Sequence, residues 1–294
     1  MQPIFNRTVL MSGAQHMNNE SPINPYMHGG EPFDVQKAID QHTAIKNSLE
    51  AIGVKVLSVE PPHNCQDGVF TANWALTRGN KAVMSSLPNV RQPEESYALA
   101  TLKRLGLEVY TLPREIKFSG QGDALPCGEY AFIGTGYRTD LEAHKFVEDK
   151  LGYKVISLQA IPELDEFGEA LINHETGWPD SNFYDLDLAI SILRPPIGEK
   201  KGLIAWCPEA FIPESQDKIR NLDFVDKIEV PLREAVGASA CNLVSTGKHV
   251  VMNANAPVLE ASIRFHGLGV TSLHNEELAK NGGSVRCTTL TIFD

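Results

Sequence analysis

The chain has 294 residues, of which 42% are hydrophobic, and its formal net charge at pH 7 is −11. This length and apolar content allow one large folded unit or two ordinary ones, with a sizeable core. The negative charge argues against nucleic acid or an anionic membrane as a partner, and no apolar run is long enough to span a bilayer.

A short strand motif with a leading glycine recurs along the chain. Each copy alternates apolar and polar residues, which is the pattern of a strand with one buried face. The clear copies cover residues 53–59, 106–112, 152–158 and 267–273, and a degenerate copy covers 226–232. Stretches with helical periodicity precede the clear copies, at residues 35–52, 94–105, 141–151 and 258–265.

The strands of this motif are followed by a polar loop and then by a predicted β-hairpin. Glycine beside Asn, Lys or Glu at the hairpin tips is the chemistry of tight turns. These hairpins cover residues 69–84, 124–134, 186–206 and 243–252. A polar marker stands at the start of each hairpin and again in the C-terminal tail, namely Asp67, Asp123, Asp187, Asn242 and Cys287.

The last hairpin can be completed only by the N-terminal strand at residues 8–11. The chain would then close a ring of five strand–helix–strand units, which predicts a single α/β domain over residues 1–294 with a five-bladed α/β-propeller fold. The polar markers would meet near the ring axis and form one pocket. The alternative is a pair of ordinary α/β domains whose segments are similar by accident.

The cysteines Cys65, Cys127, Cys207, Cys241 and Cys287 are odd in number and widely spaced. They form no C-x-x-C pair, and the sequence predicts no metal and no other cofactor. Free thiols without a signal-peptide segment indicate a reducing, cytoplasmic location. Cys287 follows two glycines, which let the backbone approach a ligand closely, so its thiol is either a covalent nucleophile or a small core residue.

Taken in order, the motifs resemble the guanidino-group-modifying superfamily of arginine deiminases, dimethylargininases, amidinotransferases and arginine dihydrolases. The similar segments lie at residues 23–27, 67–73, 120–125, 134–139, 183–187, 241–243 and in the Cys287 tail. The resemblance implies the five-bladed propeller called the pentein fold. It also implies cysteine-dependent hydrolysis of a C–N bond in the guanidino group of arginine or a close derivative. The expected partner is a small cationic guanidino substrate, and a homo-oligomer is compatible with the sequence.

The resemblance implies roles for the matched residues. Cys287 matches the nucleophile that forms a covalent thiouronium intermediate, and Asp187 matches an aspartate that binds the guanidinium. Arg138 matches an arginine positioned to meet a substrate carboxylate. The expected substrate pocket is completed by Asp67, Phe70, Asn73 and Asp123, and the context of Asn73 is most similar to that of arginine dihydrolases.

Two positions depart from the family pattern. Asp185 stands where the family has its general acid/base histidine, and Ser119 stands where it has the glutamate that orients this histidine. In one interpretation the chain is a lapsed enzyme that keeps the pocket for ligand binding or interaction. In a second, Asp185 itself is the acid/base, since burial beside Asp187 would let a carboxyl group hold a proton near neutral pH. In a third, a loop histidine, His63 or His174, takes the role of the missing acid/base histidine.

Overall fold

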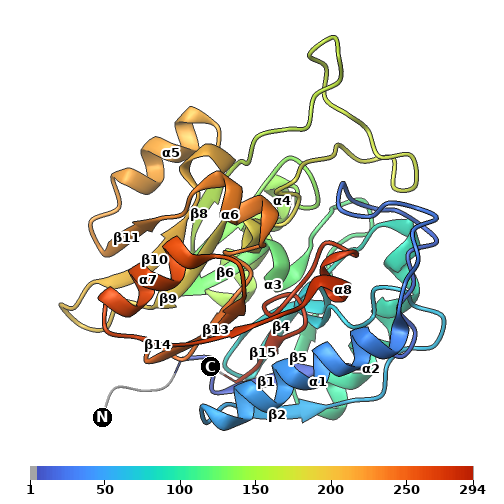
Figure 1. Cartoon of the computed structure of the whole chain (residues 1–294), viewed down its shortest axis with the longest axis horizontal. Helices are drawn as coiled ribbons and strands as arrows, with labels where there is room; N and C mark the ends of the chain where they lie inside the picture. Colours follow the sequence, from blue (N-terminus) through green and yellow to red (C-terminus); the bar gives the residue numbers. More distant parts are fainter. Residues whose placement is uncertain (1–4, 294) are drawn as a thin grey trace.

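The computed structural model describes residues 5–293 of the chain. Its strands form five three-stranded sheets, which follow one another around the molecule (Figure 1). Each sheet combines an antiparallel pair of strands with a third strand that runs parallel to its neighbour. The five-bladed α/β-propeller expected from the sequence is therefore confirmed.

Four of the sheets are built from strands that are consecutive in the chain. They consist of β3 (Ala75–Arg78), β4 (Lys81–Met84) and β5 (Glu108–Tyr110); of β6 (Ala124–Cys127), β7 (Tyr130–Gly134) and β8 (Lys154–Leu158); of β9 (Ile190–Arg194), β10 (Gly202–Trp206) and β11 (Val225–Glu229); and of β12 (Val244–Ser245), β13 (His249–Asn253) and β14 (Gly269–Leu273).

The fifth sheet joins segments from the two ends of the chain. β15 (Leu290–Thr291) pairs antiparallel with β1 (Thr8–Met11), and β1 pairs parallel with β2 (Lys55–Ser58). In this register Val9 lies opposite Thr291. The N-terminal strand therefore completes the last hairpin, as the repeat pattern predicts.

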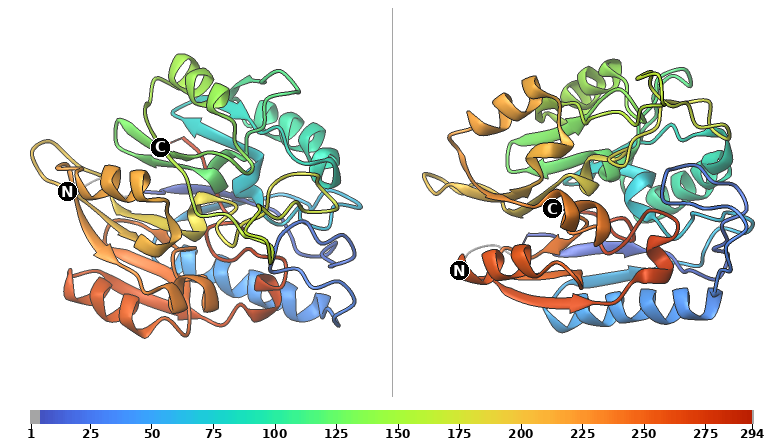
Figure 2. Two further views of the ribbon diagram at one scale, coloured as in Figure 1. Left: turned by 90° about the horizontal axis from the view of Figure 1, so that it is seen from above. Right: turned by 45° about the horizontal axis from the view of Figure 1, so that its top comes forward.

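A helix connects the second and third strands of every blade and lies on the outside of the ring (Figure 2). These helices are α1 (Val35–Ala51), α2 (Gln92–Arg104), α4 (Leu141–Leu151), α5 (Pro213–Arg220) and α7 (Pro257–Phe265). Their apolar faces are buried against the sheets, as Ala38, Ile45 and Leu49 of α1 show. Four of the five helices lie within two residues of the sequence predictions.

Short helical turns account for the differences from the predicted strands. Residues Thr71–Trp74 and Leu186–Leu188 form 3₁₀ turns, so the first and third predicted hairpins begin several residues later than expected. The degenerate strand ends at Glu229 instead of 232, because Pro231 caps α6 (Leu232–Gly237). Two four-residue helices complete the fold, α3 (Gly120–Asp123) and α8 (Glu276–Ala279).

All hairpin tips lie at one end of the ring. The Ser245 hydroxyl at the end of β12 donates to the carbonyl of Leu193 in β9 (2.7 Å). The Thr77 hydroxyl in β3 likewise donates to the carbonyl of Thr291 in β15 (2.6 Å). Because these neighbouring strands run side by side in the same sense, the polar markers that precede them gather at the other end.

The interior is filled by large side chains such as Trp74, Trp206, Phe118, Phe132 and Phe211, which are almost fully buried. The five cysteines are buried and unpaired. Within residues 5–293, no helix is both long and apolar enough to cross a membrane.

Candidate active site

The C-terminal tail places Cys287 in the centre of the ring. Gly282 has a positive φ of 81°, and a Cβ atom there would lie 2.5 Å from the Tyr184 hydroxyl. A Cβ atom on Gly283 would lie 2.4 Å from the Phe70 ring. The two glycines are therefore required for this close approach, and Cys287 behind them is only 2% exposed.

One amide side chain holds the tail and the thiol together. The Asn242 Oδ1 atom accepts from the backbone N–H groups of Ser284 (3.1 Å), Arg286 (3.0 Å) and Cys287 (3.2 Å). Its Nδ2 atom donates to the Cys287 Sγ atom at 3.1 Å. The sequence marks Asn242 as one of the repeated polar positions, but its hold on Cys287 is seen only in the structure.

Asp187 is the carboxylate partner of the thiol. The Cys287 Sγ atom donates to Asp187 Oδ2 at 3.3 Å, and Asp187 Oδ1 is buried with no hydrogen-bond partner among the described residues. Burial and the charge of Asp185 raise the pKa of Asp187 well above its ordinary value. Burial, Asp187 and Asp185 likewise raise the pKa of the Cys287 thiol. These surroundings therefore favour the thiol form of Cys287 over the thiolate.

Asp185 lies in the same buried group. Its Oδ2 atom accepts from Asn73 Nδ2 at 2.7 Å and lies 3.9 Å from Arg138 Nη1, while its Oδ1 atom is buried and unpartnered among the described residues. Arg138 also donates to the carbonyl of Ile23 (2.9 Å), and its guanidinium carbon lies 4.0 Å from the centre of the Tyr184 ring. Arg138, expected to meet a substrate carboxylate, thus already faces a carboxylate of the protein.

Asn73 is fixed in one orientation. Its Oδ1 atom accepts from Arg91 Nη1 at 2.8 Å, so its Nδ2 atom must face Asp185 and the Ser119 hydroxyl, to which it donates at 2.9 Å. Arg91 is locked in turn by two 2.8 Å hydrogen bonds to Glu94. Sequence reasoning missed Arg91, because an Arg-x-x-Glu spacing at the start of a helix is typical of exposed faces; here both side chains are buried.

Five of the predicted site residues line one small cavity, namely Asp67, Phe70, Asn73, Arg138 and Cys287. Both carboxylate oxygens of Asp67 are occupied, one by Asn281 (3.0 Å) and the other by Gln66 (2.9 Å). The cavity has a volume of about 10 Å³, which is about the room that one water molecule needs. A guanidino ligand would therefore require the cavity to open.

Asp123 lies behind this cavity. Its Oδ1 atom accepts from the backbone N–H of Leu186 at 2.9 Å and so supports the turn that carries Asp185 and Asp187. Burial and Asp185 raise the pKa of Asp123 well above its ordinary value. The structure thus places Asp123 where it positions the turn, without contact with the cavity.

Neither candidate loop histidine reaches the site. The His63 ring packs against His16 with 5.0 Å between ring centres, and His174 is exposed. No histidine of residues 5–293 lines the cavity at Cys287. In this conformation the groups that could move a proton beside Cys287 are therefore the carboxyl groups of Asp187 and Asp185.

Neutralising Asp187 is expected to stabilise the fold at neutral pH. Because the pKa of Asp187 is higher in the folded state than its ordinary value of 3.8, its contribution to stability is present at lower pH and is lost as the pH rises. We expect Asp187→Asn to raise the free energy of unfolding by about 1–3 kcal/mol at pH 7, with a smaller gain near pH 4. Denaturant unfolding at both pH values measures this. Exposed Asp217→Asn is the matched control, and a less stable Asp187→Asn variant at pH 7 would contradict the expectation.

Comparison with known proteins identifies relatives of the whole chain. The family model described as "N,N dimethylarginine dimethylhydrolase, eukaryotic" matches residues 17–174. The N(G),N(G)-dimethylarginine dimethylaminohydrolase of Mycobacterium tuberculosis is 32% identical over 271 residues, which cover 92% of this chain and 80% of that protein. The bifunctional arginine dihydrolase/ornithine cyclodeaminase ArgZ of Synechocystis sp. is 29% identical over 97% of this chain, but the match spans only 38% of ArgZ.

Solved structures agree with these matches. The cyanobacterial ArgZ N-terminal domain bound to product, an arginine dihydrolase, is 28% identical to this chain. The two superpose with a TM-score of 0.82 over 97% of this chain and 98% of that domain. A dimethylarginine dimethylaminohydrolase adduct with 20% identity and a TM-score of 0.70 shares the fold.

Proposed function

This chain belongs to the guanidino-group-modifying superfamily, and from that membership we propose that it hydrolyses a C–N bond in the guanidino group of arginine or a close derivative. Its named relatives are hydrolases of arginine or dimethylarginine. The observation that carries the proposal is the group formed by the Cys287 thiol and the buried carboxylates of Asp187 and Asp185. Each carboxylate has one oxygen without a hydrogen-bond partner among residues 5–293.

The charge of this group favours a cationic ligand. Burying a carboxylate costs free energy unless a hydrogen-bond donor or an opposite charge compensates it. Asp187 Oδ1 and Asp185 Oδ1 have no hydrogen-bond donor among the described residues. A planar guanidinium carries several N–H donors and a positive charge, and it can bind two carboxylates at once. Binding would also lower the pKa of the Cys287 thiol, because a cation beside the sulfur stabilises the thiolate.

This placement supports covalent catalysis. The Cys287 proton passes to Asp187 Oδ2, its present acceptor at 3.3 Å, while Sγ bonds to the central guanidino carbon. The C–N bond then breaks, and the leaving amine takes this proton, either from Asp187 or after its transfer to Asp185. Water adds to the thiouronium carbon and gives a proton to the carboxylate. When the C–S bond breaks, its electron pair returns to Sγ, which takes the proton of the new hydroxyl group, and the carboxyl proton passes to the released amine. Overall, a guanidinium and water become a urea and an ammonium ion.

A second candidate function is binding without turnover. It is favoured by the surroundings of Asp185, which Asn73 holds at 2.7 Å and Arg138 faces at 3.9 Å. A carboxylate held by these two donors is less free to move a proton than one facing only the ligand. In this case the chain would recognise an arginine-type ligand as a sensor or interaction protein.

Ligand binding and turnover distinguish the two candidates. We expect arginine, dimethylarginine or agmatine to stabilise the protein against thermal unfolding and to yield ammonia or an alkylamine with a urea-type product. Because Arg138 already faces Asp185, agmatine, which lacks a carboxylate, should bind within about tenfold of arginine. Calorimetry measures the binding, and amine release measures the turnover. Citrulline, which has no guanidinium, is the matched control ligand. Binding without release of amine would favour the second candidate, and no binding would contradict both.

A further inference from the structure

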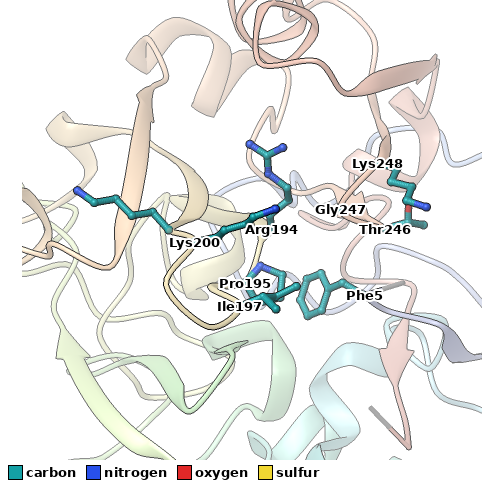
Figure 3. Close-up of a pocket in the computed structure, with 9 residues that line it drawn as sticks. Phe5, Arg194, Pro195, Ile197, Lys200, Thr246, Gly247 and Lys248 are labelled. Atoms are coloured by element: carbon teal, nitrogen blue, oxygen red, sulfur yellow. The ribbon is translucent and has the colours of Figure 1, made fainter. Parts of the chain in front are cut away.

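A second pocket lies at the end of the ring where the hairpin tips gather, away from Cys287. The β9–β10 tip and the β12–β13 tip form it together with Phe5 (Figure 3). Its volume is about 260 Å³, far larger than that of the cavity at Cys287. None of its lining residues lines the Cys287 cavity, so it is a separate site.

Four cations line this pocket. Arg194, Lys200 and Lys201 come from the β9–β10 tip, and Lys248 comes from the β12–β13 tip. Among residues 5–293, no carboxylate lies within 4.0 Å of any of these four charged groups. Glu199 is the single acidic residue of the two tips, and it does not line the pocket. None of the four charged groups therefore forms a salt bridge with a carboxylate of the described residues.

This concentration of charge contrasts with the chain as a whole, whose net charge is −11. Its effect reaches neighbouring groups, since burial and repulsion from Lys201 lower the pKa of Lys227 in β11. The two tips also meet closely, because a Cβ atom on Gly247 would lie 3.6 Å from Arg194 Cγ. Like charges placed around one pocket repel one another, and a bound anion would reduce that repulsion.

The walls of the pocket limit the size and chemistry of its ligand. Phe5, Pro195 and Ile197 lie side by side below Arg194 in Figure 3 and supply an apolar surface. A volume of about 260 Å³ lies just below the range of about 300–1,000 Å³ that is usual for drug-sized ligands. A concave site of this size suits a small molecule better than the extended surface of a nucleic acid or a membrane.

We propose that this pocket binds a small organic polyanion with phosphate groups, whose carbon skeleton lies against Phe5, Pro195 and Ile197 while its charges face Arg194 and the lysines. Guanidinium and ammonium groups are the usual protein partners of phosphate oxygens. The inference goes beyond the proposed hydrolysis, because it assigns a ligand to the opposite end of the ring and does not depend on Cys287 chemistry.

The test is titration of the full-length protein with fructose 1,6-bisphosphate and with pyrophosphate, followed by calorimetry at moderate salt. We expect saturable binding with one site per chain, and fructose itself should not bind. Arg194→Gln with Lys248→Gln should weaken binding at least about tenfold, because each lost charge-assisted contact is worth roughly that factor. The matched control is Arg104→Gln with Lys145→Gln, which removes the same charges from exposed positions on α2 and α4 and should change affinity less than about twofold.

Equal weakening in both double variants would overturn the proposal, because binding would then depend only on net charge. Absence of saturable binding with both probes would also overturn it. The proposal would also be overturned if a short oligonucleotide, or vesicles that contain phosphatidylserine, bound more tightly than fructose 1,6-bisphosphate. Thermal unfolding checks that the variants fold. If Arg194→Gln with Lys248→Gln is unfolded, Lys200→Gln with Lys201→Gln takes its place, with the same tenfold expectation.

Discussion

Replacement of Cys287 by alanine is expected to abolish hydrolysis of the guanidino group while the ligand still binds. Loss of a covalent nucleophile typically lowers kcat by about 10⁴-fold or more, because no other group can form the intermediate. Ligand binding should survive, since the buried carboxylates of Asp187 and Asp185 remain in place. Amine release measures the first effect, and calorimetry with arginine or agmatine measures the second.

Cys127→Ala is the matched control, because Cys127 is also a buried free cysteine but lies in β6, outside the cavity. This variant should lose stability through the space that it creates and keep its turnover. Trapping during turnover, followed by mass spectrometry, should find the adduct on the peptide that contains Cys287. Turnover that persists in Cys287→Ala would show that this thiol is not the nucleophile.

The double variant Asp185→His with Ser119→Glu is expected to raise turnover about 10²- to 10⁴-fold, the usual contribution of a positioned general acid/base. An imidazole at position 185 could take the thiol proton and protonate the leaving amine. The glutamate at position 119 would replace the buried negative charge lost with Asp185, so Arg138 would keep a counter-charge nearby. Initial rates of amine release with saturating substrate measure the gain.

Two further variants separate the causes of such a gain. Asp185→His alone should raise turnover less, because Arg138 loses the carboxylate of Asp185 and the new imidazole carries no negative charge. Asp185→Asn with Ser119→Glu supplies the carboxylate at position 119 without an imidazole at position 185, and it should show no gain in turnover. An inactive double variant that still binds agmatine would mean that the cavity differs from that of its relatives at more than these two positions.

Much of the fold was predictable because its signal is repeated. One strand pattern with a weak signal could be accidental, but five in register, with an N-terminal segment left to complete the last hairpin, define a closed ring. The details that failed involve short turns. Thr71–Trp74 and Leu186–Leu188 have strand-like apolar content, yet the chain must turn there to bring Asn73 and Asp187 inward. Local pattern does not encode that requirement.

The sequence predicted which residues gather at the site better than it predicted the contacts that they make there. The place of Asp187 in the repeat indicates that it meets Cys287, and the structure brings the two within 3.3 Å. The pairing of Arg138 with Asp185 was not foreseen, because it depends on side-chain directions across two blades. The same holds for Arg91, whose charge is buried through contacts with groups distant in the sequence, including the Asp67 carbonyl at 3.1 Å.

The joining of β1 to β15 also sets an order of events during synthesis. β1 leaves the ribosome before β2–β14, and its antiparallel partner β15 follows only after them. Such a distant pairing forms slowly, and until it does, one edge of β1 is open to other strands. Since Cys287 lies just before β15, the thiol meets the carboxylates of Asp187 and Asp185 only when this segment joins the ring. The full burial of Asp185 and Asp187 would therefore be reached only when the ring closes.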